Sequence, residues 1–213
     1  MRLTKYMVVL YCVTLISATL AFAQKSQDTL RATVGNPQLQ KELLDMEVND
    51  QNVEHLFVDT MSQHPNDTLG IIAFIKKMDS VFNRNTAALK KILQRYGWPG
   101  IDLVGREGAE AAFLIVQHST DTLFQRACLP LLRTACEHGQ ASGDNLALLT
   151  DRVLVRDGRP QLYGTQTKIV NGKIVLETIA DSADVDARRA KLGLMPLSKY
   201  LELLRETIHL KDK

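Results

Sequence analysis

The chain has 213 residues, of which 45% are hydrophobic and 23% are charged, and these fractions are ordinary for a folded domain. They exclude a disordered tail, a collagen-like repeat and a small disulfide-stabilised scaffold. The 26 basic and 24 acidic residues nearly cancel and form no basic cluster, which argues against a nucleic acid as partner.

Residues 1–23 have the features of a secretory signal peptide. Arg2 and Lys5 precede the apolar stretch Met7–Leu20, and Ala21-Phe22-Ala23 forms a small-x-small cleavage site. We therefore predict that the mature protein is exported to the periplasm or the extracellular space, with an uncleaved anchor helix as the alternative. The apolar stretch is shorter than the about 20 residues of a membrane-spanning helix, and no later stretch predicts a membrane span.

We expect a flexible, polar lead-in over residues 24–35 and a single globular domain over residues 36–213. Asn36-Pro37 is typical of a helix N-cap followed by proline at the first helical position. Asn49-Asp50 can cap a second helix, because the short side chains of Asn and Asp accept hydrogen bonds from backbone N–H groups.

A long amphipathic helix is predicted after the break at residues 64–67. It begins at Asp67 or Thr68, and Gly97 ends it as a C-terminal cap. Asn83–Asn85 is a possible kink within this helix.

The next predicted helix, Ala109–Val116, is apolar on all sides and is expected at the centre of the domain. Thr120 or Asp121 can cap the helix that follows. Cys128 and Cys136 lie eight residues apart on that helix, about 12 Å along its axis. Because a disulfide needs Cα atoms within about 7 Å, we predict two free and mostly buried thiols. A further short helix is predicted over Asp144–Asp151.

The pattern then changes to strands. Gln161–Val170 and Lys173–Thr178 are rich in β-branched residues and flank Asn171-Gly172, which is a strong signal for a hairpin turn. Val185–Lys191 and Leu197–Leu210 return to a helical pattern. The predicted fold class is therefore mainly α (α+β), with one small antiparallel β-hairpin near residues 161–178.

Familiar phosphate-binding, zinc-protease and serine-hydrolase motifs are absent from the sequence, so the candidate site consists of polar residues in apolar surroundings. His118 follows the most apolar helix and is the strongest general acid–base candidate, with Asp121 or Asp151 to orient its ring. Arg152 can hold a carboxylate or phosphate group. In a strand, Gln161, Tyr163 and Thr165 would share one face, and Leu162, Gly164 and Gln166 the other.

The candidate catalytic residues are His118, Asp121 and Asp151. The candidate ligand-binding residues are Gln117, Gln125, Arg152, Gln161, Tyr163, Thr165, Gln166 and Arg188. This lining suits a small neutral or anionic molecule. The sequence indicates no cofactor and no oligomeric state.

Several of these segments carry a resemblance: Tyr96-Gly97-Trp98-Pro99, Val116-Gln117-His118, Thr150-Asp151-Arg152-Val153, Gln161-Leu162-Tyr163-Gly164-Thr165-Gln166, Asp186-Ala187-Arg188-Arg189 and Leu192-Gly193-Leu194. Together they resemble a bacterial domain-of-unknown-function family, the one numbered 6624, over roughly Leu39 to Tyr200. The family often has Gln-His-Ala-Asp, whereas here Asp121 stands one position later. The resemblance implies no activity, because none is assigned to the family.

Three functional hypotheses remain open from the sequence. The first is a ligand-binding or hydrolytic pocket around His118. The second is a non-catalytic module of the cell envelope, in which the same polar residues form a structural hydrogen-bond network. The third is a metal site that uses His118 and Asp121, for which the sequence offers no clear third ligand.

Overall fold

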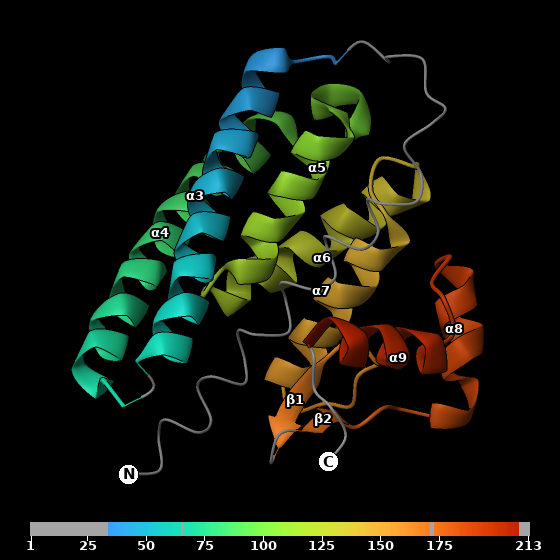
Figure 1. Cartoon of the computed structure of the whole chain (residues 1–213). Helices are drawn as coiled ribbons and strands as arrows, with labels where there is room; N and C mark the ends of the chain where they lie inside the picture. The colour runs from blue at the N-terminus through green and yellow to red at the C-terminus, as the bar shows by residue number, and fades with distance from the viewer. Residues whose placement is uncertain (1–33, 65, 171–172, 209–213) are drawn as a thin grey trace. The chain divides into compact units, whose positions relative to one another are not determined.

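A computed structural model of the chain describes residues 34–64, 66–170 and 173–208 (Figure 1). These residues form seven α-helices, one short 3-10 helix and a two-stranded antiparallel sheet. The prediction of a mainly helical fold with one small hairpin is therefore confirmed. The predicted signal peptide, nearly all of the predicted lead-in and the turn residues Asn171-Gly172 lie outside the described residues.

The described residues group into two compact units, an amino-terminal unit up to Leu146 and a carboxy-terminal unit from Ala147 onward. The boundary falls within helix α7 (Gly143–Arg156). Each unit has its own set of buried polar groups, and these groups are the basis of the functional argument.

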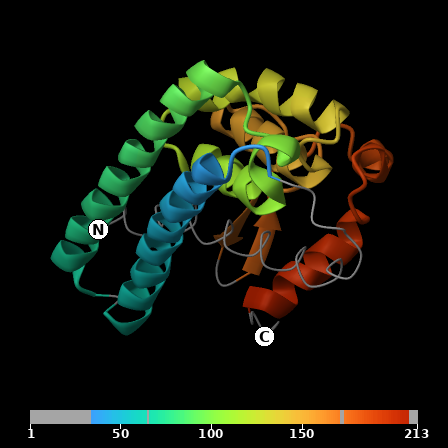
Figure 2. The ribbon, with the colours of Figure 1, turned by 90° about the horizontal axis from the view of Figure 1, so that it is seen from above.

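The amino-terminal unit contains α3 (Pro37–Gln63), α4 (Thr68–Tyr96), α5 (Ile101–His118) and α6 (Thr122–Glu137). Helices α3 and α4 lie side by side as an antiparallel pair, and α3 also packs against α5 (Figures 1 and 2). The fully buried apolar side chains of this unit include Leu43, Met78, Phe82, Leu89, Phe113 and Ile115.

Short polar side chains begin three of these helices, as the sequence predicts. Asn36, Asp67 and Asp121 each accept a hydrogen bond from a backbone N–H group three residues later, at distances of 2.9–3.0 Å. Gly97 ends α4 with a φ of +70°, a conformation that favours glycine. The predicted caps are therefore confirmed.

The prediction that Asn49-Asp50 starts a second helix is wrong, because α3 continues through both residues. Asn49 donates a hydrogen bond to the carbonyl of Asp45 within the same helix, and Asp50 is completely buried. Helix α4 likewise continues through the predicted kink at Asn83–Asn85. Of the polar residues that seemed to interrupt these helices, Asp50 and Asn85 are buried in the core, whereas Asn49 and Asn83 are exposed.

Helix α5 confirms the apolar segment Ala109–Val116, of which all residues but Glu110 are buried. The helix starts earlier than predicted, at Ile101, and contains a break at Gly105, whose φ is +70°. On α6, Cys128 and Cys136 are free thiols, as predicted, and Cys128 is buried.

The carboxy-terminal unit contains the rest of α7, strands β1 (Thr167–Val170) and β2 (Lys173–Leu176), and a 3-10 helix (Ser182–Asp184). Helices α8 (Val185–Lys191) and α9 (Leu197–Ile208) follow. In the antiparallel sheet Thr167 pairs with Leu176 and Val170 with Lys173.

The predicted strand at Gln161–Gln166, with its alternating faces, is wrong. Gln161 forms only an isolated bridge with Ile179, and Gly164 has a φ of +71°. Backbone N–H groups of this segment bond to the Asp151 side chain instead of to a neighbouring strand. The segment is therefore a loop around a buried carboxylate.

Among the described helices, none combines the length and the apolar character that a bilayer crossing requires.

Candidate functional site

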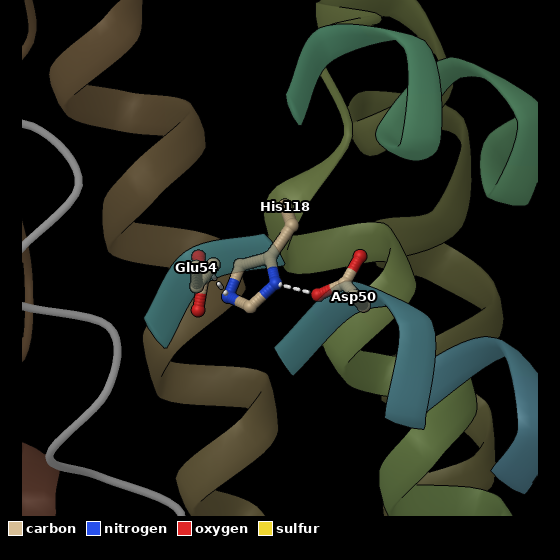
Figure 3. A group of neighbouring side chains, drawn as sticks. All are labelled: Asp50, Glu54 and His118. Atoms are coloured by element: carbon tan, nitrogen blue, oxygen red, sulfur yellow. Dashed lines mark hydrogen bonds and ion pairs between the residues drawn. The ribbon is translucent and has the colours of Figure 1, made fainter. Parts of the chain in front are cut away.

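The amino-terminal unit buries two carboxylates and an imidazole together (Figure 3). Asp50 and Glu54 lie one turn apart on α3 and therefore on the same helix face, and His118 is the last residue of α5. Their exposed fractions are 0%, 3% and 5%. One potential ligand atom of each residue lies within 4.8 Å of those of the other two. We call these three residues the Asp50–Glu54–His118 centre.

Each nitrogen of the His118 ring faces a carboxylate. Nδ1 is hydrogen-bonded to Oδ2 of Asp50, and Nε2 lies 3.4 Å from Oε1 of Glu54 (Figure 3). The imidazole is thus held between two acidic side chains of one helix.

Helix α4 supports this arrangement from a third direction. Asn85, which is buried, donates hydrogen bonds to the carbonyl of Met46 at 3.1 Å and to Oδ1 of Asp50 at 3.5 Å. The Phe82 ring lies 5.6 Å from the His118 ring, measured between centroids. Asp50 and His118 are therefore fixed by several contacts at once.

The end of α5, which carries His118, is also held by α6. Gln125 is fully buried, and its side chain donates to the carbonyls of Val116 at 2.9 Å and Gln117 at 3.1 Å. On the other side, Thr86 donates to the hydroxyl of Ser119 at 2.9 Å. Gln117 and Gln125 thus contribute to the placement of the imidazole.

A further carboxyl group, that of Glu47, lies near Asp50. Burial raises the pKa of Glu47 to about 7, and the nearby Glu110, Asp50 and Glu107 contribute to the rise. Burial also raises the pKa of Glu110, although the hydrogen bond from Asn145 at 2.8 Å opposes this rise. Acidic side chains of α3 and α5 therefore lie close enough to influence each other's protonation.

The donor set of the centre supports two kinds of chemistry. Imidazole nitrogen and carboxylate oxygen together are ligands of divalent transition metals. A histidine oriented by an aspartate is also a common general acid–base arrangement.

Asp121, the predicted partner of His118, has a different set of contacts. It caps α6, and its carboxylate lies 2.7 Å from Nζ of Lys90. The hydrogen bond from Lys90, followed by that from the N–H of Phe124, lowers the pKa of Asp121. Asp50, which the sequence analysis did not select, takes the place beside the imidazole.

The carboxy-terminal unit contains the second candidate catalytic carboxylate, Asp151, which is fully buried in α7. It accepts hydrogen bonds from the N–H groups of Leu162 at 2.7 Å, Tyr163 at 3.1 Å and Thr165 at 2.9 Å, and from the Thr165 hydroxyl at 2.9 Å. Burial raises the pKa of Asp151, and these hydrogen bonds oppose the rise.

Other predicted ligand-binding residues hold the same loop. Gln161 donates from its side chain to the carbonyls of Gln166 and Glu177, both at 2.9 Å, and accepts from the Gln166 N–H at 2.8 Å. Arg188 donates to the carbonyls of Leu162 at 2.8 Å and Ala180 at 2.5 Å. Arg152 is buried on α7.

The predicted site residues therefore fall into two groups. His118, Gln117 and Gln125 lie together in the amino-terminal unit. The candidate residues near Asp151 lie together in the carboxy-terminal unit. A pocket shared by both groups stays a prediction.

The model of a family of unknown function, DUF6624, matches residues 37–213. The chain belongs to this family. Neither the curated proteins nor the solved structures gave a significant match. Membership of DUF6624 assigns no activity, so a function has to be argued from the residues themselves.

Asp50 and Glu54 were missed in the sequence analysis, although α3 carries a signal for them. Its buried apolar side chains include Leu43, Met46 and Phe57, and Asp50 and Glu54 continue the same helix face. Acidic residues within an apolar stripe are rarely buried without a partner. That pattern indicates a buried partner elsewhere in the chain.

Proposed function

We propose that this protein is exported and binds a divalent metal ion at the Asp50–Glu54–His118 centre. One observation carries the proposal. Three side chains of metal-ligand type, each at least 95% buried, offer one atom apiece within 4.8 Å of one another.

The charge of the centre supports the same conclusion. Asp50 and Glu54 each face one nitrogen of the His118 ring, so two buried carboxylates meet at one imidazole. Removing a carboxylate from water costs several kcal/mol, and a nearby cation offsets part of that cost. The pKa of Glu47 is raised mainly by burial and also by the neighbouring Asp50, so a further acidic group lies near the centre. A divalent cation would interact favourably with these groups.

A bound metal ion would also supply the hydrolytic chemistry that the sequence suggested. Divalent ions such as Zn²⁺ lower the pKa of a bound water molecule and so generate a nucleophile near neutral pH. A small neutral or anionic molecule is the class of substrate that fits this chemistry. The proposed export depends on the features of residues 1–23 alone.

Metal content tests the proposal. The full chain is purified without chelators, equilibrated with Zn²⁺ and desalted, and its metal is quantified by plasma mass spectrometry. We expect about one equivalent of metal in the wild type and in His55→Ala, and a loss of metal in His118→Ala. His55 is the matched control, because it lies next to Glu54 on α3 but is exposed.

Wild-type protein that retains no metal, under conditions in which it is folded by circular dichroism, would contradict the proposal. This result does not depend on whether His118→Ala folds. Equal loss of metal from His55→Ala would point to a surface site and would contradict the proposal as well.

A second candidate function is metal-free acid–base catalysis by His118. The hydrogen bond between Asp50 and Nδ1 favours it, because a carboxylate in this position orients the ring of a catalytic histidine. Chelation distinguishes the two functions. Activity that survives removal of all metal supports the acid–base function, and activity that is lost and returns with Zn²⁺ supports the metal function.

The alternative of a non-catalytic cell-envelope module draws support from the carboxy-terminal unit. There Asp151, Gln161 and Arg188 bind mainly the backbone groups of their own loop. Such contacts are sufficient to explain these residues as a structural network.

A further inference from the structure

We infer that the ion at this centre is a transition-metal cation, such as Zn²⁺ or Co²⁺, held directly by Nε2 of His118 and the carboxylate of Glu54. Asp50 is then a positioning residue that acts through Nδ1 and is not itself a ligand. This inference rests on the proposed function, and it assigns different roles to the three members of the centre.

The contact between Asp50 and His118 excludes an ion between them. Oδ2 of Asp50 and Nδ1 are in direct hydrogen-bond contact, which leaves no space for a metal. A histidine that binds a metal through Nε2 must carry its proton on Nδ1, and a carboxylate commonly accepts that proton. Asp50 lies where this arrangement requires an acceptor.

On the opposite side of the ring, the distance between Nε2 and the Glu54 carboxylate is longer than that of a charged hydrogen bond. Nε2 of His118 and Oε1 of Glu54 are 3.4 Å apart, whereas a charged hydrogen bond between such atoms is about 2.7–2.9 Å long. Two ligands at about 2.0–2.1 Å from a tetrahedral zinc ion are separated by about 3.3 Å. The spacing therefore fits two neighbouring ligands of one ion.

Asn85 supports the separate role of Asp50. Its side-chain amide contacts Oδ1 of Asp50, while Oδ2 contacts the imidazole, so both carboxylate oxygens already have a protein partner. Asn85 is anchored in turn to the carbonyl of Met46. This chain of contacts fixes the orientation of the ring without a contribution from the ion.

The ligand types decide the class of ion. Imidazole together with a carboxylate suits Zn²⁺ and other divalent transition metals, whereas Mg²⁺ and Ca²⁺ prefer oxygen ligands alone. Two direct protein ligands leave further positions of the ion for water or for a substrate.

Cadmium-113 NMR tests the assignment in the wild-type protein. A cadmium ion on Nε2 is three bonds from both carbon-bound ring protons, Hδ2 and Hε1, whereas an ion on Nδ1 is three bonds from Hε1 only. We expect cadmium coupling to both protons of His118. Coupling to Hε1 alone would overturn the inference.

Affinity measurements test the role of Asp50. In competition titrations with Zn²⁺, we expect Asp50→Asn to weaken binding by about 10- to 100-fold, which is the usual effect of removing the hydrogen-bond partner of a metal-binding histidine. This variant should keep the cadmium coupling to both Hδ2 and Hε1 of His118. Glu54→Gln should weaken Zn²⁺ binding further and remove the cadmium coupling to the ring protons of His118. Asp45→Asn and Glu42→Gln, at exposed positions of the same helix, should bind as the wild type does.

The outcomes separate this inference from the proposed function. Wild-type protein that binds neither Zn²⁺ nor Cd²⁺ would contradict both. Stoichiometric binding in which Asp50→Asn loses the metal as completely as Glu54→Gln would make Asp50 a direct ligand. That result would overturn the inference and leave the proposed function standing. Equal affinity for Mg²⁺ and Zn²⁺ would overturn the assigned class of ion.

Discussion

Each of the two units buries a helix-borne aspartate, but the partners of these aspartates differ. Asp151 accepts its hydrogen bonds from backbone N–H groups and one hydroxyl of a single loop, so its role is to fix that loop. Asp50 bonds to an imidazole and an amide from two other helices.

This difference separates a structural carboxylate from a candidate site. When a buried carboxylate accepts hydrogen bonds from backbone N–H groups, these dipoles stabilise its negative charge and are fixed parts of the fold. The centre around Asp50 instead combines a second carboxylate, Glu54, with an imidazole, and all three are side chains of metal-ligand type. Unlike a carboxylate held by the N–H groups of one loop, such a donor set is suited to bind a cation.

The largest expected effect concerns the structural aspartate. Asp151→Ala would leave three backbone N–H groups without their acceptor, and each such buried group costs about 1–3 kcal/mol. We expect the free energy of unfolding to fall by about 3–5 kcal/mol in urea titrations. The exposed Asp157, which directly follows the last residue of α7, serves as control in Asp157→Ala. A loss below 1 kcal/mol would contradict the structural role of Asp151.

The second prediction uses zinc to separate the two units. A ligand present at 100 times its Kd stabilises the folded state by about 2.7 kcal/mol. We expect this gain in the wild type and in Asp151→Asn, but not in Glu54→Gln. Thermal unfolding with and without Zn²⁺ measures it. Stabilisation of Glu54→Gln to the same degree would place the metal elsewhere.

The third prediction concerns how the stability of the metal-free protein depends on pH. Because the pKa of Glu47 rises from 4.5 to about 7, the folded state binds this proton more tightly than the unfolded chain does. The stability that Glu47 contributes is therefore complete below pH 4.5 and is lost as the pH rises through 7.

Glu47→Gln has no ionisable group at this position, so it avoids the loss of stability that ionisation of Glu47 causes as the pH rises. We expect the variant to exceed the wild type in unfolding free energy by about 1–2 kcal/mol at pH 8.5, a value reduced for solvent screening, and by nothing at pH 4. Glu42→Gln, at an exposed position of α3, is the control. A constant difference at both pH values would be inconsistent with a raised pKa at Glu47.

The smallest effect is expected at Asp121. Asp121→Ala removes the N-cap of α6 and the contact with Lys90, and loss of such a cap costs about 1 kcal/mol. The affinity for Zn²⁺ should stay within about twofold of the wild type, since a partly exposed ion pair between α4 and α6 contributes little. Asp67→Ala, which removes the cap of α4, should behave in the same way. A large loss of zinc affinity in Asp121→Ala alone would restore Asp121 as a partner of His118.

Local signals in the sequence predicted much of the fold correctly. The caps at Asn36, Asp67 and Asp121, the end of α4 at Gly97 and the apolar character of α5 all depend on residues within one or two helical turns. The same local reasoning failed at Asn49-Asp50, because capping residues and buried polar residues have the same side chains.

The candidate site was predicted only in part. His118 was selected because it follows an apolar helix, and it lies at the centre of the site. Its acidic partners were sought nearby in the sequence, at Asp121, whereas Asp50 lies 68 residues away in the chain. In the same way, the segment after Gln161 has the composition of a strand, but a buried carboxylate from α7 determined its backbone conformation.

Composition, helix periodicity and capping residues by themselves determined that the chain forms a mainly helical protein with one hairpin, because these signals act over a few neighbouring residues. Only the tertiary structure decided which acids face the imidazole and which acid holds a loop. Packing of α3 against α5 removes Asp50 and Glu54 from water, and a buried charge has to be balanced by whatever groups the fold places beside it.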